Sequence, residues 1–176
     1  MKAIVFDWET TGLTLHADAP LEKQPRAIEF GGALVDESGA IVRELSLLIH
    51  PGEQISAEIT KITGITNADL ADAPRLAEVL PQIRALFAEA DMAIAHNLSF
   101  DRTILRLELQ RHAVVDFPWP ARELCTVEAF SPLWGRRPKL TELYQEVIGQ
   151  PLAQTHRALD DVRALVEVVV KEGLHK

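Results

Sequence analysis

The sequence predicts a layered α/β or α+β domain, and two observations lead to this prediction. Near the start of the chain, apolar and polar residues alternate, which is the period of a half-buried strand. Later segments repeat apolar residues every three or four positions, which is the period of a helix packed on one face. Because strand-like segments come first and helix-like segments are interleaved later, we expect sheet and helices to form separate packed layers.

The first third of the chain contains three predicted strands. Residues 2–8 alternate with period two, and "AIEFGGALVD" (27–36) and "AIVRELSLLIH" (40–50) are separated only by "ESG". A short polar connection of this kind is typical of a tight turn between antiparallel strands. The simplest arrangement is therefore a meander of three strands. Residues 14–26 contain two prolines and mixed charges, which predicts an exposed loop.

The rest of the chain is mainly helical in pattern. A short helix is predicted around residues 56–62 and a longer one over residues 73–90, where Pro81 could break the helix. "MAIAH" (92–96) is a short apolar strand, and residues 114–122 form a loop rich in proline and aromatic residues. Further helices are predicted over residues 99–112, 126–132, 139–148 and 157–172.

Length and composition limit the class of protein. With 176 residues, 47% apolar and 25% charged, the chain is expected to form one domain spanning residues 1–176. No segment approaches the roughly 20 consecutive apolar residues that cross a bilayer, and the start does not resemble a signal peptide. We therefore expect a cytoplasmic protein without membrane contact. The single cysteine, Cys125, excludes an internal disulfide and a thiolate metal cluster.

The net charge of −8 argues against nonspecific binding of nucleic acid through a basic surface. Two features qualify this argument. Acids that bind divalent cations would be neutralised by those cations. The segment "WGRRPK" (134–139) is also a local basic cluster, which is either a strand-binding loop or simply a solvated turn.

The first candidate site lies at the end of the first strand. Alternation places Ile4, Phe6 and Trp8 on one face, so Asp7 and Glu9 share the other. Two carboxylates on one face repel each other unless a positive group neutralises them. Either the strand emerges into solvent here, or the acids form an oxygen-ligand site for Mg²⁺ or Mn²⁺.

The second candidate is Asp101 in "AHNLSFDRTIL". In a helix, Asp101 would fall between Ile104 and Leu105 within an apolar arc. A carboxylate in such a position needs a partner. An ion pair with Arg102 or Arg106, a favourable position at the helix N-terminus, or a metal ion would each supply one.

The third candidate lies in "THRALDDVRALVEVVV". Helical rotation places Asp161 at the border of an apolar stripe, whereas Asp160 points nearly opposite, into solvent. His156 lies close enough in sequence to share a site with Asp161. A lone histidine is usually structural, but beside an acid cluster it becomes a candidate general base.

Three of these segments together carry a family resemblance. "FDWETTGL", "AHNLSFD" and "HRALDD", in this order, resemble the three motifs of the DEDDh (DnaQ-like) superfamily of 3'-to-5' exonucleases, which includes the polymerase III proofreading subunit and exonuclease X. The resemblance covers nearly the whole chain. It implies a ribonuclease H-like α/β fold, with a central mixed five-stranded sheet whose first three strands form a meander, flanked by helices.

The resemblance also implies roles for individual residues. Asp7, Glu9, Asp101 and Asp161 would hold two divalent cations, Mg²⁺ or Mn²⁺. His156 lies five residues before Asp161, as in the histidine subtype, and would be the catalytic base. The predicted contacts to the terminal 3' nucleotide come from Thr10, Thr11, Gly12, Leu13, Asn97 and Phe100, with the first three as a backbone cradle and Leu13 as a wedge.

The implied function is release of nucleoside 5'-monophosphates from nucleic-acid 3' ends, as in proofreading or DNA repair. DNA with single-stranded or frayed ends is favoured over RNA as the substrate. An exoribonuclease of the same fold is the main alternative. Remote alternatives are a haloacid dehalogenase-type phosphatase, in which Glu9 would replace an aspartate, and a non-catalytic nucleic-acid-binding domain.

The chain also departs from the family pattern. The loop after Leu13 is longer than usual, and no polymerase-binding C-terminal extension follows the last helix before Lys176. The second feature favours a stand-alone nuclease, either a monomer or a homodimer.

Overall fold

The computed structural model describes residues 1–176 and contains one five-stranded mixed sheet in the order β3-β2-β1-β4-β5. Strands β1 (Lys2–Thr10), β2 (Ala27–Asp36) and β3 (Ile41–Leu48) form an antiparallel meander. Strands β4 (Met92–Ala95) and β5 (Arg122–Cys125) continue the sheet in parallel on the other side of β1. The predicted sheet and its opening meander are confirmed.

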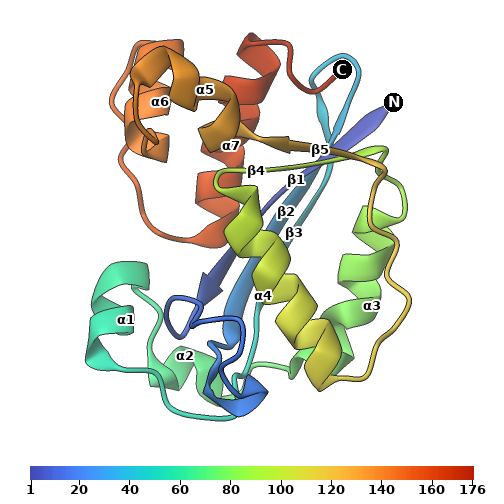
Figure 1. Cartoon of the computed structure of the whole chain (residues 1–176), viewed down its shortest axis with the longest axis vertical. Helices are drawn as coiled ribbons and strands as arrows, with labels where there is room; N and C mark the ends of the chain where they lie inside the picture. The colour runs from blue at the N-terminus through green and yellow to red at the C-terminus, as the bar shows by residue number, and fades with distance from the viewer.

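Helices cover both faces of this sheet (Figure 1). Helices α3 and α4 lie on one side, and α6 and α7 lie on the other. None of the helices is long and apolar enough to cross a membrane. The helical elements are η1 (Leu21–Lys23, a 3-10 turn), α1 (Ala57–Thr63), α2 (Asn67–Ala71), α3 (Leu76–Phe87), α4 (Leu98–Arg111), α5 (Thr126–Trp134), α6 (Leu140–Ile148) and α7 (Ala158–Lys171).

The alternation of β1 divides its side chains between two apolar clusters. Ile4, Phe6 and Trp8 belong to the cluster beneath α3 and α4. Ala3 and Val5 belong to the cluster beneath α7. Trp8 is 3% exposed and its ring packs 4.7 Å from that of Phe30, so its predicted core position is confirmed.

The end of β1 extends beyond its parallel neighbour. Pairing with β4 stops at Val5 opposite Ile94, whereas pairing with β2 continues through Glu9 opposite Glu29. The chain leaves β4 and turns directly into α4, so the last residues of β1 lie beside the start of that helix. Crevices at the carboxyl ends of strands, where neighbouring connections diverge, are the usual ligand sites of open α/β sheets.

Several local predictions differ from the structure. Helix α3 runs through Pro81 without a break, and α5 continues through Pro132 to Trp134. The predicted loop over residues 114–122 ends one residue earlier, because Arg122 begins β5. This short edge strand carries charged side chains, which are common on edges and obscure the apolar signal of a strand.

The loop over residues 14–26 is mostly exposed, as predicted, but its last part is held against the protein. Gln24 is buried: its side chain accepts a hydrogen bond from the Leu15 amide and donates one to the His16 carbonyl. Arg111, at the end of α4, donates to the carbonyls of Leu21 and Gln24. The loop is therefore tied to the end of α4 opposite the candidate site.

Candidate active site

Asp101 projects from the first turn of α4 towards the end of β1. Its side chain is 1% exposed, and its Oδ1 accepts a hydrogen bond from the backbone amide of Trp8 at 3.2 Å. Asp101 forms no ion pair, and neighbouring Arg102 instead binds Glu123 at 3.0 Å. The alternative of an arginine partner for Asp101 is therefore wrong. The contact instead places Asp101 beside the strand segment that carries the two acids of β1.

The two aspartates of α7 differ in the way that helical rotation predicts. Asp161 is 8% exposed and its Oδ2 accepts a hydrogen bond from Gln154 Nε2 at 2.8 Å. Asp160 is exposed, and its carboxylate accepts a bond from the Thr155 hydroxyl at 2.9 Å. The inward direction of Asp161 is confirmed, so of this pair it is the acid that faces the β1 residues.

His156 precedes α7 with a left-handed backbone (φ 51°), a conformation that non-glycine residues adopt rarely and that is often found at functional sites. The structure brings its ring together with two of the acids. His156, Glu9 and Asp161 each offer one ligand atom, and these three atoms lie within 4.8 Å of one another. A histidine separated from Glu9 by more than a hundred residues thus shares one small site with it.

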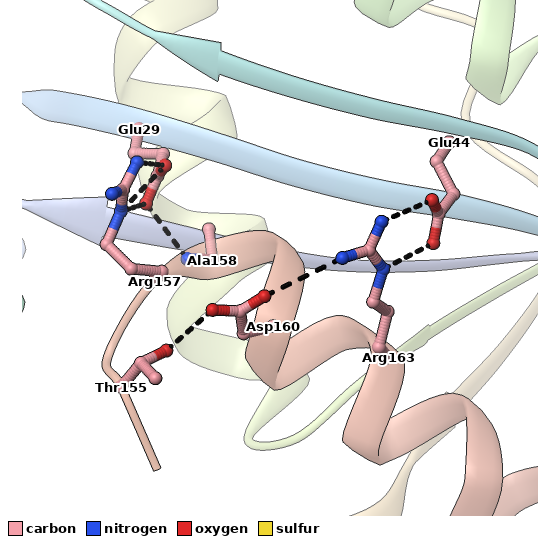
Figure 2. A network of polar contacts seen from close by, with 7 residues as sticks. All are labelled: Glu29, Glu44, Thr155, Arg157, Ala158, Asp160 and Arg163. Atoms are coloured by element: carbon pink, nitrogen blue, oxygen red, sulfur yellow. Dashed lines mark hydrogen bonds and ion pairs between the residues drawn. The ribbon is translucent and has the colours of Figure 1, made fainter.

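The start of α7 is anchored to β2 by a buried carboxylate (Figure 2). Glu29 is 1% exposed, and its Oε1 accepts from Arg157 Nη2 at 2.6 Å while its Oε2 accepts from the Ala158 amide at 2.9 Å. A second constraint comes from Gly31, because a Cβ at this position would lie 2.4 Å from the carbonyl carbon of Ala158. Since Gly31 is paired with Asp7, this close approach brings α7 onto β2 directly beside the β1 acids.

Burial and mutual repulsion shift the pKa of every acid in the group upward. Burial and the charge of Asp161 raise the pKa of Asp7 well above its ordinary range. Burial, followed by the charges of Asp7 and Asp161, raises the pKa of Glu9 to about 9. Burial also raises the pKa of Asp101, helped by the charge of Asp7, and it raises the pKa of Asp161. The charges of Arg157 on Glu9 and of His156 on Asp161 oppose these shifts only in part, so the four acids are incompletely compensated.

This donor set fits divalent cations. Carboxylate oxygens are the ligands that Mg²⁺ and Mn²⁺ prefer, and the four acids converge from three separate elements. Arg157 is the arginine whose charge acts on Glu9, but Glu29 binds it. A bound cation would supply the missing positive charge and would remove the repulsion that raises the pKa values.

The residues expected to contact the terminal nucleotide surround the same strand end. Thr10 and Thr11 form a tight turn, in which the Thr10 hydroxyl donates to the Gly12 carbonyl at 2.7 Å and the Thr11 hydroxyl accepts from the Arg26 amide at 2.9 Å. Leu13 is 81% exposed. A Cβ on Gly12 would meet no atom within 4 Å, so the fold itself does not require glycine there.

Asn97 and Phe100 lie just before Asp101, at the start of α4. Asn97 adopts a left-handed conformation at the start of α4, and its Oδ1 accepts a hydrogen bond from Arg137 Nη2 at 2.6 Å. Phe100 is partly buried against the cluster beneath α3 and α4. The structure thus brings the four acids and His156 together at the end of β1, where Thr10 to Leu13 follow, and places Asn97 and Phe100 at the start of α4. Contacts of these residues with substrate stay predictions.

Two residues of this region were missed by sequence reasoning. Glu29 interrupts an otherwise apolar strand whose neighbours are all buried, and that interruption was a signal that it needs a buried partner. Gln154, which holds Asp161, lies in an irregular segment before α7 and carries no such signal.

Comparison with known proteins decides the family. Residues 4–169 match the RNase_T family model, whose description is "Exonuclease". The chain belongs to this exonuclease family. Members of the family are hydrolases that act on phosphodiester bonds, so membership argues against the phosphatase alternative.

Curated relatives and solved structures agree with this assignment. The chain is 33% identical over 168 residues to the PolC-type DNA polymerase III of Thermotoga petrophila, covering 96% of this chain but 12% of that polymerase. It is 32% identical over 170 residues to DNA polymerase III subunit epsilon of Treponema pallidum, covering 93% of this chain and 72% of that subunit. The chain therefore spans only a small part of the PolC-type polymerase but most of the epsilon subunit.

Among solved structures, exonuclease X in complex with 5' overhanging duplex DNA has a TM-score of 0.68 and 25% identity, covering 97% of this chain and 92% of the other. The nuclease domain of 3'hExo, a DEDDh family member bound to rAMP, has a TM-score of 0.79 and 18% identity, covering 98% and 92%. The second likeness establishes the fold alone.

Proposed function

We propose that this exonuclease-family chain removes nucleoside 5'-monophosphates from the 3' ends of nucleic acid in a reaction that requires divalent cations, Mg²⁺ or Mn²⁺. The observation that carries the proposal is the convergence of Asp7, Glu9, Asp101 and Asp161 with His156 at the end of β1. The single domain expected over residues 1–176 would contain every residue that the reaction needs.

DNA is the proposed substrate. The epsilon-subunit relative belongs to a DNA polymerase, and the exonuclease X structure contains duplex DNA with a 5' overhang, which presents a recessed 3' end. A 3'-to-5' exoribonuclease of the same fold is the alternative, because a 2'-hydroxyl is distinguished only by contacts at the terminal sugar.

In the proposed mechanism, the four acids hold the cations and position the scissile phosphate. When bound, the cations supply positive charge where negative charge develops on the phosphodiester oxygens. His156 accepts the proton of the attacking water, since its ring already lies beside Glu9 and Asp161 and histidine is a common general base. Gln154 keeps the Asp161 carboxylate oriented by donating to its Oδ2.

The terminal nucleotide is proposed to lie against the turn of Thr10 to Gly12. The open space beside Gly12 leaves room for the sugar and phosphate to approach the backbone. Leu13 is a largely exposed apolar side chain that can pack against the last base. Phe100 and Asn97 would contact the terminal nucleotide from the side opposite this turn.

The test is incubation of the purified chain with oligonucleotides labelled at the 5' end. Single-stranded DNA, duplex DNA and RNA are each compared with Mg²⁺, Mn²⁺ or a chelator. We expect stepwise shortening from the 3' end only when a divalent cation is present, with DNA shortened fastest. Faster shortening of RNA would transfer the proposal to the exoribonuclease alternative.

Asp7→Asn is the control for the site. It should abolish shortening while the circular dichroism spectrum stays that of the wild type, because Asn is isosteric and Asp7 forms no structural ion pair. An Asp7→Asn protein with near wild-type turnover would remove the central claim.

A further inference from the structure

A cavity of about 570 Å³ lies next to the candidate site and is rich in hydrogen-bond donors and positive charge. Its walls come from the start of α4, the loop before α6 and the segment before α7, and no carboxylate lines it. Its polar lining includes Asn97, Arg137, Lys139 and His156. His156 belongs both to this cavity and to the group formed with Glu9 and Asp161, so the two sites are continuous.

The two arginines of the loop before α6 are used differently. Arg136 binds both carboxylate oxygens of Glu142, at 2.7 and 2.9 Å, and its charge is therefore compensated. Arg137 forms no ion pair; one of its N–H groups donates to Asn97 Oδ1 at 2.6 Å. Arginine has five donors in a planar fork, so most of those of Arg137 stay free for a ligand.

Lys139 adds a second positive charge that is exposed and forms no ion pair. It precedes α6, and the first residues of that nine-residue helix, Leu140 and Thr141, also line the cavity. Backbone amides at the start of a helix favour an anion. Two free cations and a helix start therefore face one space in a chain whose net charge is −8.

From this arrangement we propose that Arg137 and Lys139 bind a phosphate of the substrate strand other than the one that is cleaved. The inference rests on the proposed function, because it assigns the scissile phosphate to the acids of β1. The bond between Arg137 and Asn97 links the cavity to the predicted site of the terminal nucleotide, so the next phosphate along the strand is the ligand that the geometry places there. This contact also counters the repulsion between an acidic site and a polyanion.

Binding is tested with fluorescein-labelled single-stranded dT10 by fluorescence anisotropy, in an Asp7→Asn background that prevents cleavage. Arg137→Gln should weaken binding about tenfold, the loss expected for a charge-assisted hydrogen bond. It should also reduce the slope of log K against log salt concentration by about 0.7, the value for one phosphate contact on a single strand. Lys139→Gln should act in the same direction.

Lys171→Gln is the matched control, because it removes the same charge from the exposed far end of α7 and should change neither quantity. Unchanged affinity and salt slope in Arg137→Gln would overturn the proposal.

Cleavage separates this phosphate from the scissile one. The p-nitrophenyl ester of thymidine 5'-monophosphate contains only the scissile phosphate, so Lys139→Gln, which leaves the bond between Arg137 and Asn97 intact, should leave its kcat/KM unchanged while raising KM for dT10. Equal losses on both substrates would contradict the proposal. If the wild-type chain cleaved neither substrate, the proposed function would fail, yet the anisotropy result would still decide whether the cavity binds phosphate.

Discussion

The neighbouring acids Asp160 and Asp161 show how position on a helix decides what a carboxylate can do. One residue of helix turns the side chain by about 100°, so Asp161 enters the site beside Glu9 and His156 while Asp160 stays in solvent. The two residues have the same chemistry, and only their direction differs. They therefore form a natural matched pair for testing the site.

Asp161→Asn should lower the rate of 3'-end shortening by at least about a hundredfold. Loss of a residue that only hydrogen-bonds a metal ligand already costs up to about a hundredfold, and Asp161 is itself a proposed ligand. Asp160→Asn should stay within about twofold of the wild type, since its contacts are with Thr155 and, weakly, Arg163. Initial rates on one labelled oligonucleotide measure both. Comparable losses in the two variants would show that helix α7 does not present Asp161 to the reaction.

His96 is a second residue whose environment fixes its state. Its Nε2 lies 3.2 Å from the Pro138 carbonyl, which can only accept, so Nε2 carries the proton and Nδ1 accepts from the Thr126 hydroxyl at 3.0 Å. Burial lowers the pKa of His96 to about 4. The neutral ring thus ties the loop containing Arg137 to the start of α4.

The sign of the resulting pH dependence is set by linkage between proton binding and folding. Between pH 6.5 and about 4 the unfolded chain binds a proton at His96 that the folded chain does not, so the free energy of unfolding should fall as the pH falls. The full effect is up to about 3 kcal/mol. Urea unfolding of wild type and His96→Gln across this range measures it, and the variant should show the shallower decline. An NMR titration placing the pKa of His96 near its ordinary value would contradict the prediction.

At the scale of elements, the attachment of α7 decides the geometry of the site. The helix is joined to the sheet by two similar ion pairs, Glu29 with Arg157 at its start and Glu44 with Arg163 further along (Figure 2). Only the first lies next to His156. Glu29 also accepts from the Ala158 amide, so it fixes both the side chain and the backbone at the point where α7 begins.

Glu29→Gln should reduce kcat by about tenfold or more with little change in KM, because a misplaced His156 and Asp161 impair the reaction more than strand binding. Stability should fall by only about 1–3 kcal/mol, since Gln can still accept from the Ala158 amide and Arg157 is 43% exposed. Glu44→Gln is the matched control on the same helix. It should lose little stability and keep wild-type kcat, whereas equal kcat losses would indicate a general loosening of α7.

These contacts also explain how far the sequence could predict the structure. Periodicity identified the meander, the core position of Trp8 and the inward direction of Asp161, because each depends on residues close together in the chain. The bond between Glu29 and Arg157 joins residues 128 positions apart, and no local pattern encodes it. The same reason applies to Gln24, whose burial depends on Arg111 at the end of another element. The edge strand β5 was missed because its charged residues hide the apolar signal that identified the equally short β4, and the five-residue helix α2 was missed because it is too short for a periodic signal.

At the scale of the whole molecule, the fold concentrates like charges at one end of its central strand. Asp7, Glu9, Asp101 and Asp161 each have a raised pKa, so in the absence of cations this end of the sheet opposes folding as the acids ionise. A cation that binds only the folded chain should reverse this effect. Site chemistry and global stability are therefore coupled.

Mn²⁺ or Mg²⁺ should accordingly raise the melting temperature of the wild-type chain. Binding to the folded state alone contributes about 2.7 kcal/mol when the ion is present at a hundred times its Kd, which corresponds to about 5–10 °C for a chain of this size. Asp7→Asn should melt no lower than the wild type without cations, because it removes one of the repelling charges, but it should gain little when cations are added. Differential scanning calorimetry with and without Mn²⁺, at ionic strength matched with NaCl, measures both effects. A wild-type protein indifferent to Mn²⁺, or an Asp7→Asn protein stabilised just as strongly, would mean that cations do not bind among these acids. Because this readout involves no substrate, it tests the metal site independently of the polymer that the enzyme cuts.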